Sequence, residues 1–173
     1  MPNMQTDELV MFMETWDGEA GRTATLLQAL PKDQYDFRPD KDGRSLGELA
    51  WHLAEIDGYM SLVATTGFSP GERPPGIERP RTVAELAPGY TRVHADAKAR
   101  LAKLTSADLE RQTKFFDGSS IPVRRVLWGA LLHHAIHHRG QLAMLCRMAG
   151  GSPPGLYGPN REETAASRAR AKA

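Results

Sequence analysis

Apolar residues recur at helical spacing along four stretches of the chain. Because side chains three and four positions apart share one face of a helix, each stretch predicts an amphipathic helix. No convincing set of alternating strands lies between them, so we expect an all-α protein, a four-helix bundle. The predicted helices cover residues 7–30, Leu46 to about Val63, 82–104 and 122–149.

Local signals mark where two of these helices begin. "SLGE" at 45–48 and "TVAE" at 82–85 both have the form of a capping box, in which a hydroxyl and a carboxylate satisfy the first free amides of a helix. Pro88 and Gly89 follow soon after the second box. They predict a kink or a split early in the third helix.

The connections are long enough to change the topology of a simple up-and-down bundle. Residues 64–81 and 105–121 leave room for crossover connections, and the second contains an Asp117–Gly118 turn signal that favours either a small hairpin or a folded loop. We expect one domain over residues 1–160. Residues 161–173 are charged and small, which predicts a flexible tail or a frayed helix.

Composition excludes several classes of function. The chain has 22 basic and 21 acidic residues, with no basic stripe interleaved with aromatic residues, which gives no argument for nucleic acid. No apolar run approaches the roughly 18 to 20 residues that a membrane span needs, and the N-terminus lacks the pattern of a signal peptide, so we expect a cytoplasmic protein. Cys146 is the one cysteine, which excludes an internal disulfide and a cysteine-cluster metal site. We expect it to be a small buried apolar residue.

Four of the six histidines lie within "HHAIHH" at residues 133–138. On a helical wheel of about 100° per residue, His134 and His138 fall in the middle of the most apolar face, and His133 and His137 point about 100° away. We interpret this second pair as supporting, interface or exposed groups. The apolar face is formed by Leu127, Leu131, Leu142 and Leu145.

Two imidazoles four residues apart on a helix can converge on one metal ion, and His52 offers a third ligand. It lies beside the apolar stripe of the second predicted helix, from which it can reach across the bundle to His134 and His138. Three imidazoles with an open fourth position are typical of catalytic zinc-type sites. The alternative is a set of hydrogen-bonded core histidines that bind no metal.

Other residues near this predicted site receive weaker assignments. Gln141 lies one turn beyond His138 and is a candidate for orienting a ligand or substrate, whereas Arg139 lies farther round and is expected to be structural. Glu55 is one turn from His52 but on the far side from the stripe, so we expect it to be solvated. His94 is expected at the surface. Candidate pocket walls are Trp51, Phe68, Phe116 and Tyr157.

"SLGELAWHLAEIDGYM" together with "HHAIHHRGQLAMLCRMAGGSPPGLYG" resembles the DinB family of metalloenzyme-like proteins. The resemblance implies a four-helix bundle in which His52, His134 and His138 hold a divalent metal ion. Imidazole ligands suit zinc or nickel first, with manganese or iron as alternatives. Relatives are similar to thiol-dependent enzymes, including bacillithiol or mycothiol S-transferases and a mycothiol-dependent maleylpyruvate isomerase. The resemblance also implies a homodimer.

These observations leave several functional hypotheses open. The first is an enzyme that uses the metal ion to activate a low-molecular-weight thiol for attack on an electrophilic small molecule. A metal-dependent hydrolase acting through water is the nearest alternative. A third hypothesis is a stress-response or binding protein in which the metal stabilises the fold without turnover. The sequence assigns no general base and does not choose the substrate or the thiol.

Overall fold

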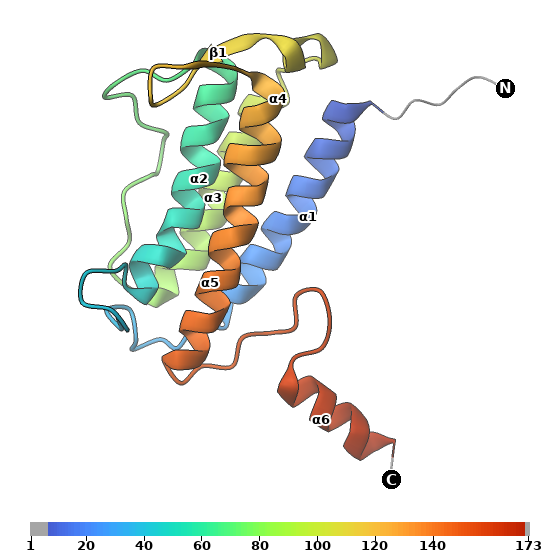
Figure 1. Ribbon diagram of the computed structural model, residues 1–173. Helices are drawn as coiled ribbons and strands as arrows, with labels where there is room; N and C mark the ends of the chain where they lie inside the picture. The colour runs from blue at the N-terminus through green and yellow to red at the C-terminus, as the bar shows by residue number, and fades with distance from the viewer. Residues whose placement is uncertain (1–6, 172–173) are drawn as a thin grey trace, which may run out of the picture.

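The expectation of an all-α protein is confirmed by the computed structural model, which describes residues 7–171 and is mostly helical (Figure 1). The long helices are α1 (Glu8–Gln28), α2 (Leu46–Thr66) and α3 (Val83–Leu101), followed by a helical run of α4 (Val123–Arg125), η2 (Val126–His133) and α5 (His134–Met148). The shorter elements are η1 (Ser106–Glu110), β1 (Gln112–Lys114), β2 (Ser120–Pro122) and α6 (Arg161–Arg170).

The long connection after α2 is a crossover. It returns the chain from the end of α2 to the opposite end of the molecule, so that α3 runs parallel to α2, while α1 and α5 run in the opposite direction (Figure 1). The connection after α3 differs, because η1 and the two strands join α3 to α4 at one end of the helices (Figure 1). Of the two crossovers for which the sequence left room, the structure forms the first.

The capping box at the start of α2 is confirmed, and the one at the start of α3 is wrong. The Glu48 amide donates to Ser45 Oγ at 3.2 Å, and the Ser45 amide donates to Glu48 Oε2 at 2.8 Å. At α3, the Thr82 hydroxyl instead donates to Glu85 Oε2 at 2.6 Å, so no side chain caps that helix. The hydroxyl is used as a donor where a cap needs an acceptor.

Of the kink or split predicted early in the third helix, the split is wrong, because α3 continues through Pro88 as one helix. The structure gives Gly89 a different role, which is close packing. A Cβ atom at Gly89 would lie 2.7 Å from Cζ3 of Trp51 on α2. The glycine therefore permits α2 and α3 to approach each other.

The second long connection contains the small hairpin that the turn signal allowed. Strands β1 and β2 pair antiparallel, and Gly118 has a φ of 82° in the turn between them. The hairpin lies against the end of α2, since the Thr113 hydroxyl donates to the Val63 carbonyl at 2.6 Å and the Phe68 amide donates to the Lys114 carbonyl at 2.8 Å.

The sequence led us to expect one uniform α-helix for the last helical run, but the structure differs. Pro122 precedes its first residue, and Val126–His133 form a π-helix before α-helical geometry resumes at His134. Hydrogen bonds in a π-helix run from residue i to i+5, so each turn contains more residues than an α-helical turn. Leu127 and Leu131 are nevertheless fully buried, as predicted.

Arg161–Arg170 form a helix in the segment for which a flexible tail or a frayed helix was expected. Asn160 and Glu163 make a capping box that opens α6, and no residue of α6 is buried. Arg147 of α5 pairs with Glu162 at 2.7 Å. Among the helices of residues 7–171, none is both long and apolar enough to cross a bilayer.

Candidate metal centre

Three histidines from two antiparallel helices meet in the groove between α2 and α5. One ring nitrogen of each of His52, His134 and His138 lies within 4.8 Å of the corresponding atoms of the other two. The ring centroids of His52 and His138 are 4.8 Å apart, and those of His134 and His138 are 4.6 Å apart. The structure therefore brings together the three residues that the helical wheel had selected.

Each of these imidazoles is held through its Nδ1 atom by an oxygen on its own helix. Carbonyl, carboxylate and amide oxygens only accept hydrogen bonds, so each Nδ1 carries the hydrogen and each Nε2 presents a bare lone pair. This is the tautomer that a metal-ligating histidine requires when Nε2 is the ligand atom. The acceptors are Glu55 Oε2, 3.0 Å from His52; the Ala130 carbonyl, 3.3 Å from His134; and Gln141 Oε1, 2.6 Å from His138.

The Nε2 atoms of His134 and His138 face each other at 2.8 Å. With both Nδ1 atoms protonated, two lone pairs at this separation repel each other unless a cation lies between them. Two nitrogen ligands on one tetrahedral zinc ion are about 3.4 Å apart, so a small opening of the pair accommodates a metal. In the described part of the chain, no fourth histidine, cysteine, aspartate or glutamate joins the group.

Electrostatics in the groove favours the neutral imidazoles that metal binding needs. Burial lowers the pKa of His138 to about 4, and the positive charge that His52 and His134 carry when protonated acts in the same direction. Burial, followed by the charge of His52, also lowers the pKa of His134. Both rings are therefore neutral at pH 7, where protons compete little with a metal ion.

The sequence model of the DinB family matches residues 1–171. The chain belongs to the DinB family. The uncharacterized protein YrdA of Bacillus subtilis is 31% identical over 156 residues, which cover 89% of this DinB chain and 90% of YrdA.

Two crystal structures of DinB-like proteins share the fold. One from Bacillus cereus has a TM-score of 0.68 at 26% identity, and the match covers 84% of this chain and 95% of that protein. YjoA of Bacillus subtilis has a TM-score of 0.68 at 23% identity, covering 87% of this chain and 99% of YjoA.

Two cavities adjoin the histidines of this DinB protein, one toward each end of the groove. The first, of about 340 Å³, is lined by His52, His134 and by apolar groups that include Phe116 of the hairpin turn. The second, of about 490 Å³, is lined by His138, Gln141 and residues toward the end of α5. The candidate metal centre is therefore accessible from both directions along the groove.

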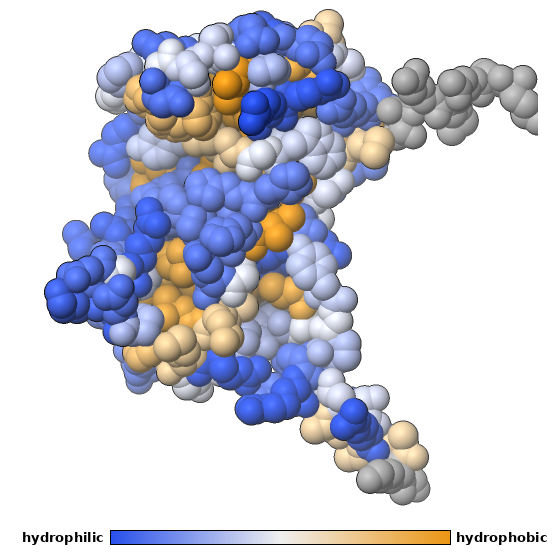
Figure 2. All heavy atoms as spheres, in the orientation of Figure 1, coloured by the Kyte–Doolittle hydropathy of each residue, from blue (hydrophilic) through white to orange (hydrophobic). Residues whose placement is uncertain are grey.

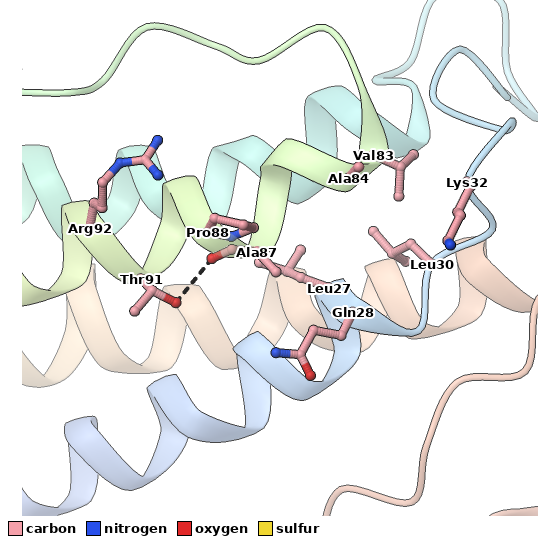
Figure 3. Close-up of a pocket in the computed structure, with 10 residues that line it drawn as sticks. All are labelled: Leu27, Gln28, Leu30, Lys32, Val83, Ala84, Ala87, Pro88, Thr91 and Arg92. Atoms are coloured by element: carbon pink, nitrogen blue, oxygen red, sulfur yellow. Dashed lines mark hydrogen bonds between the residues drawn. The ribbon is translucent and has the colours of Figure 1, made fainter.

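Another cavity, of about 630 Å³, lies between α1 and α3 (Figure 3). Its lining contains no histidine, cysteine, aspartate or glutamate, and the Thr91 hydroxyl is occupied by a 3.0 Å hydrogen bond to the Ala87 carbonyl (Figure 3). It offers no metal ligands, and the chemistry of this DinB protein is better sought in the groove between α2 and α5.

Glu55 is the contact of the candidate site that the sequence interpretation missed. We expected a solvated side chain, because the wheel places it away from the apolar stripe, yet it accepts the hydrogen bond of His52 Nδ1. Residues three apart on a helix can touch even when one of them faces outward. The spacing "HLAE" at 52–55 was the available signal.

The predicted pocket walls are only partly correct. Phe116 lines the cavity beside His52, and the ring centroids of Phe68 and Phe116 are 4.6 Å apart. Trp51 is instead buried in the core, where its indole donates to the Ile77 carbonyl at 3.0 Å. Tyr157 contacts Glu19 and Arg139, and it lines neither cavity beside the histidines.

His94, which we expected at the surface, is buried and joins three helices of the DinB fold. Its Nδ1 atom lies 2.8 Å from Asp57 Oδ2 on α2, and its Nε2 atom lies 3.3 Å from Asp17 Oδ1 on α1. Trp16 donates to the other oxygen of Asp57 at 3.0 Å. The expectation was wrong because the position at the edge of one helix's stripe did not reveal the carboxylates supplied by two other helices.

The remaining assignments agree with their expectations. Arg139 is buried and structural, since it donates to the Glu19 carbonyl at 2.7 Å and pairs with the Glu19 carboxylate. Cys146 is fully buried, and burial raises the pKa of its thiol. His133 and His137 are exposed, although the His137 ring lies 5.1 Å from that of His138.

Proposed function

We propose that this DinB family protein is a metal-dependent enzyme that transfers the sulfur of a low-molecular-weight thiol to an electrophilic small molecule. His52, His134 and His138 would hold a divalent ion, with zinc or nickel as the first candidates and manganese or iron as alternatives. One observation carries the proposal: a ring nitrogen of each of His52, His134 and His138 lies within 4.8 Å of those of the other two, without a fourth ligand from the described chain. Three protein ligands and an open position are typical of catalytic rather than structural sites.

When bound, such an ion lowers the pKa of a coordinated thiol or water toward neutrality and so supplies the nucleophile. The chain itself holds the rings in place through Glu55 and Gln141. Its own thiol is unsuited to the reaction, because Cys146 is buried and burial raises its pKa. The sulfur would therefore come from a separate thiol, and the two cavities beside the histidines offer space for two reactants.

The test combines metal content with thiol consumption. We expect purified protein to contain a stoichiometric divalent ion and to accelerate the loss of a small thiol in the presence of an alkylating electrophile. Chelation and His138→Ala should both reduce the rate to that of the uncatalysed reaction, and adding the metal back should restore activity to the chelated protein alone. Equal rates with and without metal would contradict the proposal.

The alternatives are separated by the substrate that is consumed and by the effect of the metal ion on stability and on the cobalt spectrum. Consumption of an ester or amide without loss of thiol would indicate a metal-dependent hydrolase. If chelation lowers the melting temperature while added thiols leave the spectrum of a cobalt-substituted protein unchanged, the ion is structural.

A further inference from the structure

The cavity beside His138 combines apolar walls with a single charged side chain. Leu49 of α2 and Met144, Leu145 and Met148 of α5 form the apolar walls, and Arg44 lies just before α2. No aspartate or glutamate lines this cavity. A ligand in this space would therefore meet an apolar surface and one positive charge.

The two methionines indicate that the apolar walls are used for binding. Met144 and Met148 lie one turn apart on α5 and are 65% and 56% exposed, whereas Leu142 and Leu145 of the same helix are buried. Apolar surface is visible in the lower half of the face that carries α2 and α5, among hydrophilic side chains (Figure 2). Exposed apolar clusters mark binding sites, and methionine adapts its shape to different ligands.

Arg44 differs from its charged neighbours because it forms no ion pair with the described residues. Arg38 and Arg79 both pair with Glu48, at 2.9 and 3.3 Å, and Lys41 pairs with Asp42 at 2.8 Å. Arg44 makes no ion pair or side-chain hydrogen bond with residues 7–171. A free guanidinium presents a planar fork of donors that matches a carboxylate.

The cavity on the other side of the histidines has the opposite character. Its lining includes the carboxylate of Glu55 and no lysine or arginine. An anionic group is therefore attracted to the cavity of Arg44 and disfavoured in the other one. The groove is therefore positively charged at the Arg44 end and negatively charged at the Glu55 end, and the three histidines lie between the two ends.

We propose that Arg44 binds a carboxylate of the small-molecule substrate, whose apolar part lies against Leu49, Met144 and Met148 while its reacting end reaches the histidines. One guanidinium balances one negative charge, which favours a monocarboxylate over a dianionic phosphate. The inference rests on the proposed metal-dependent function, because the histidines define where the reacting end lies.

Linear alkyl hydroxamates provide the test, because the hydroxamate group chelates the metal ion and the alkyl chain extends along the groove. Dissociation constants are measured for a series of chain lengths, each ending either in a carboxylate or in a methyl group. At the length that spans the cavity, we expect the carboxylate probe to bind wild-type protein about tenfold more tightly. Arg44→Gln should remove this preference without changing the metal content. Lys41→Gln, the same change of charge in the same loop, should preserve it.

Two results would overturn the inference: equal binding of both probe series at every length, or a carboxylate preference that survives Arg44→Gln. A second arm measures binding of a linear alkyl carboxylate and of the matching amide to metal-free protein. If no preparation binds metal but the carboxylate still binds better than the amide through Arg44, the proposed function fails and the Arg44 site stands. If metal is bound but neither arm shows the preference, this inference alone fails.

Discussion

Each candidate ligand is oriented by a residue of its own helix. His52 is held by Glu55 and His138 by Gln141, both three residues onward, and His134 is held by the carbonyl four residues before it. Each of these contacts joins residues three or four positions apart, so none of them depends on a residue of another helix. The tautomers that expose the three Nε2 atoms are thus decided by local sequence.

We expect Glu55→Ala and Gln141→Ala each to weaken metal binding by about 10- to 100-fold, because a histidine that loses its Nδ1 acceptor also loses its fixed tautomer and orientation. Competition with a chromophoric chelator measures the affinity. Glu14→Ala, which removes an exposed glutamate of α1, is the control and should bind metal like the wild type. Wild-type affinity in both test variants would show that the acceptors are irrelevant to the site.

The ligand residues were predictable from the sequence because helical spacing separates His134 and His138 from His133 and His137. The contacts of Glu55 and His94 were not predictable from the sequence, and both failures have the same cause. The wheel of a single helix shows which way a side chain points, but it does not show which residue will contact that side chain. The contact residue can lie one turn away on the same helix, or it can lie on another helix. His94 receives its carboxylates from α1 and α2, whose positions relative to α3 no spacing within α3 reveals.

At the level of elements, His94 connects α1, α2 and α3 through Asp17 and Asp57. Lys98 of α3 also pairs with Asp17, at 2.9 Å. Burial alone would lower the pKa of His94, but the hydrogen bond and negative charge of Asp57, with those of Asp17, raise it above the ordinary value. Folding therefore favours the protonated imidazole.

This shift predicts how stability depends on pH. Because the pKa in the folded protein exceeds the unfolded value of about 6.5, the contribution of His94 is fully present below pH 6.5 and is lost as the pH rises through the higher folded pKa. His94→Gln should lower the free energy of unfolding by about 3 kcal/mol below pH 6.5. Its free energy of unfolding should also change less than that of the wild type as the pH rises above 6.5. Urea unfolding at a series of pH values measures both effects. A variant whose profile parallels that of the wild type would contradict the assignment.

The extents of the helices were largely predictable, whereas their geometry and directions were not. The apolar pattern continues through Val126–His133 without a visible change, so it does not distinguish a π-helix from an α-helix. The lengths of the two connections permitted crossovers equally. The structure uses only the first, because the hairpin and η1 occupy the second at one end of the helices (Figure 1).

At the scale of the whole molecule, the proposed ion links helices that are distant in sequence, since His52 lies on α2 and His134 on α5. An ion that binds the folded state and not the unfolded chain should raise the free energy of unfolding, by about 2.7 kcal/mol at a concentration of 100 times Kd. Thermal unfolding with increasing metal concentration measures this. His52→Ala should abolish the response and His133→Ala, at an exposed position outside the site, should retain it. A melting temperature independent of metal would contradict a site that spans the two helices.

The π-helix of η2 makes the orientation of the site depend on chain length as well as on residue identity. A π-turn contains about one residue more than an α-turn, so removing one residue from Val126–His133 would allow an ordinary α-helix with little change in the angular position of the residues that follow. Removing a second residue has no such compensation and would rotate His134 and His138 by about 100°, out of the groove, with every ligand still encoded. A homologue could therefore lose the metal centre, while it keeps all three histidines, through a two-residue deletion within the segment that corresponds to Val126–His133.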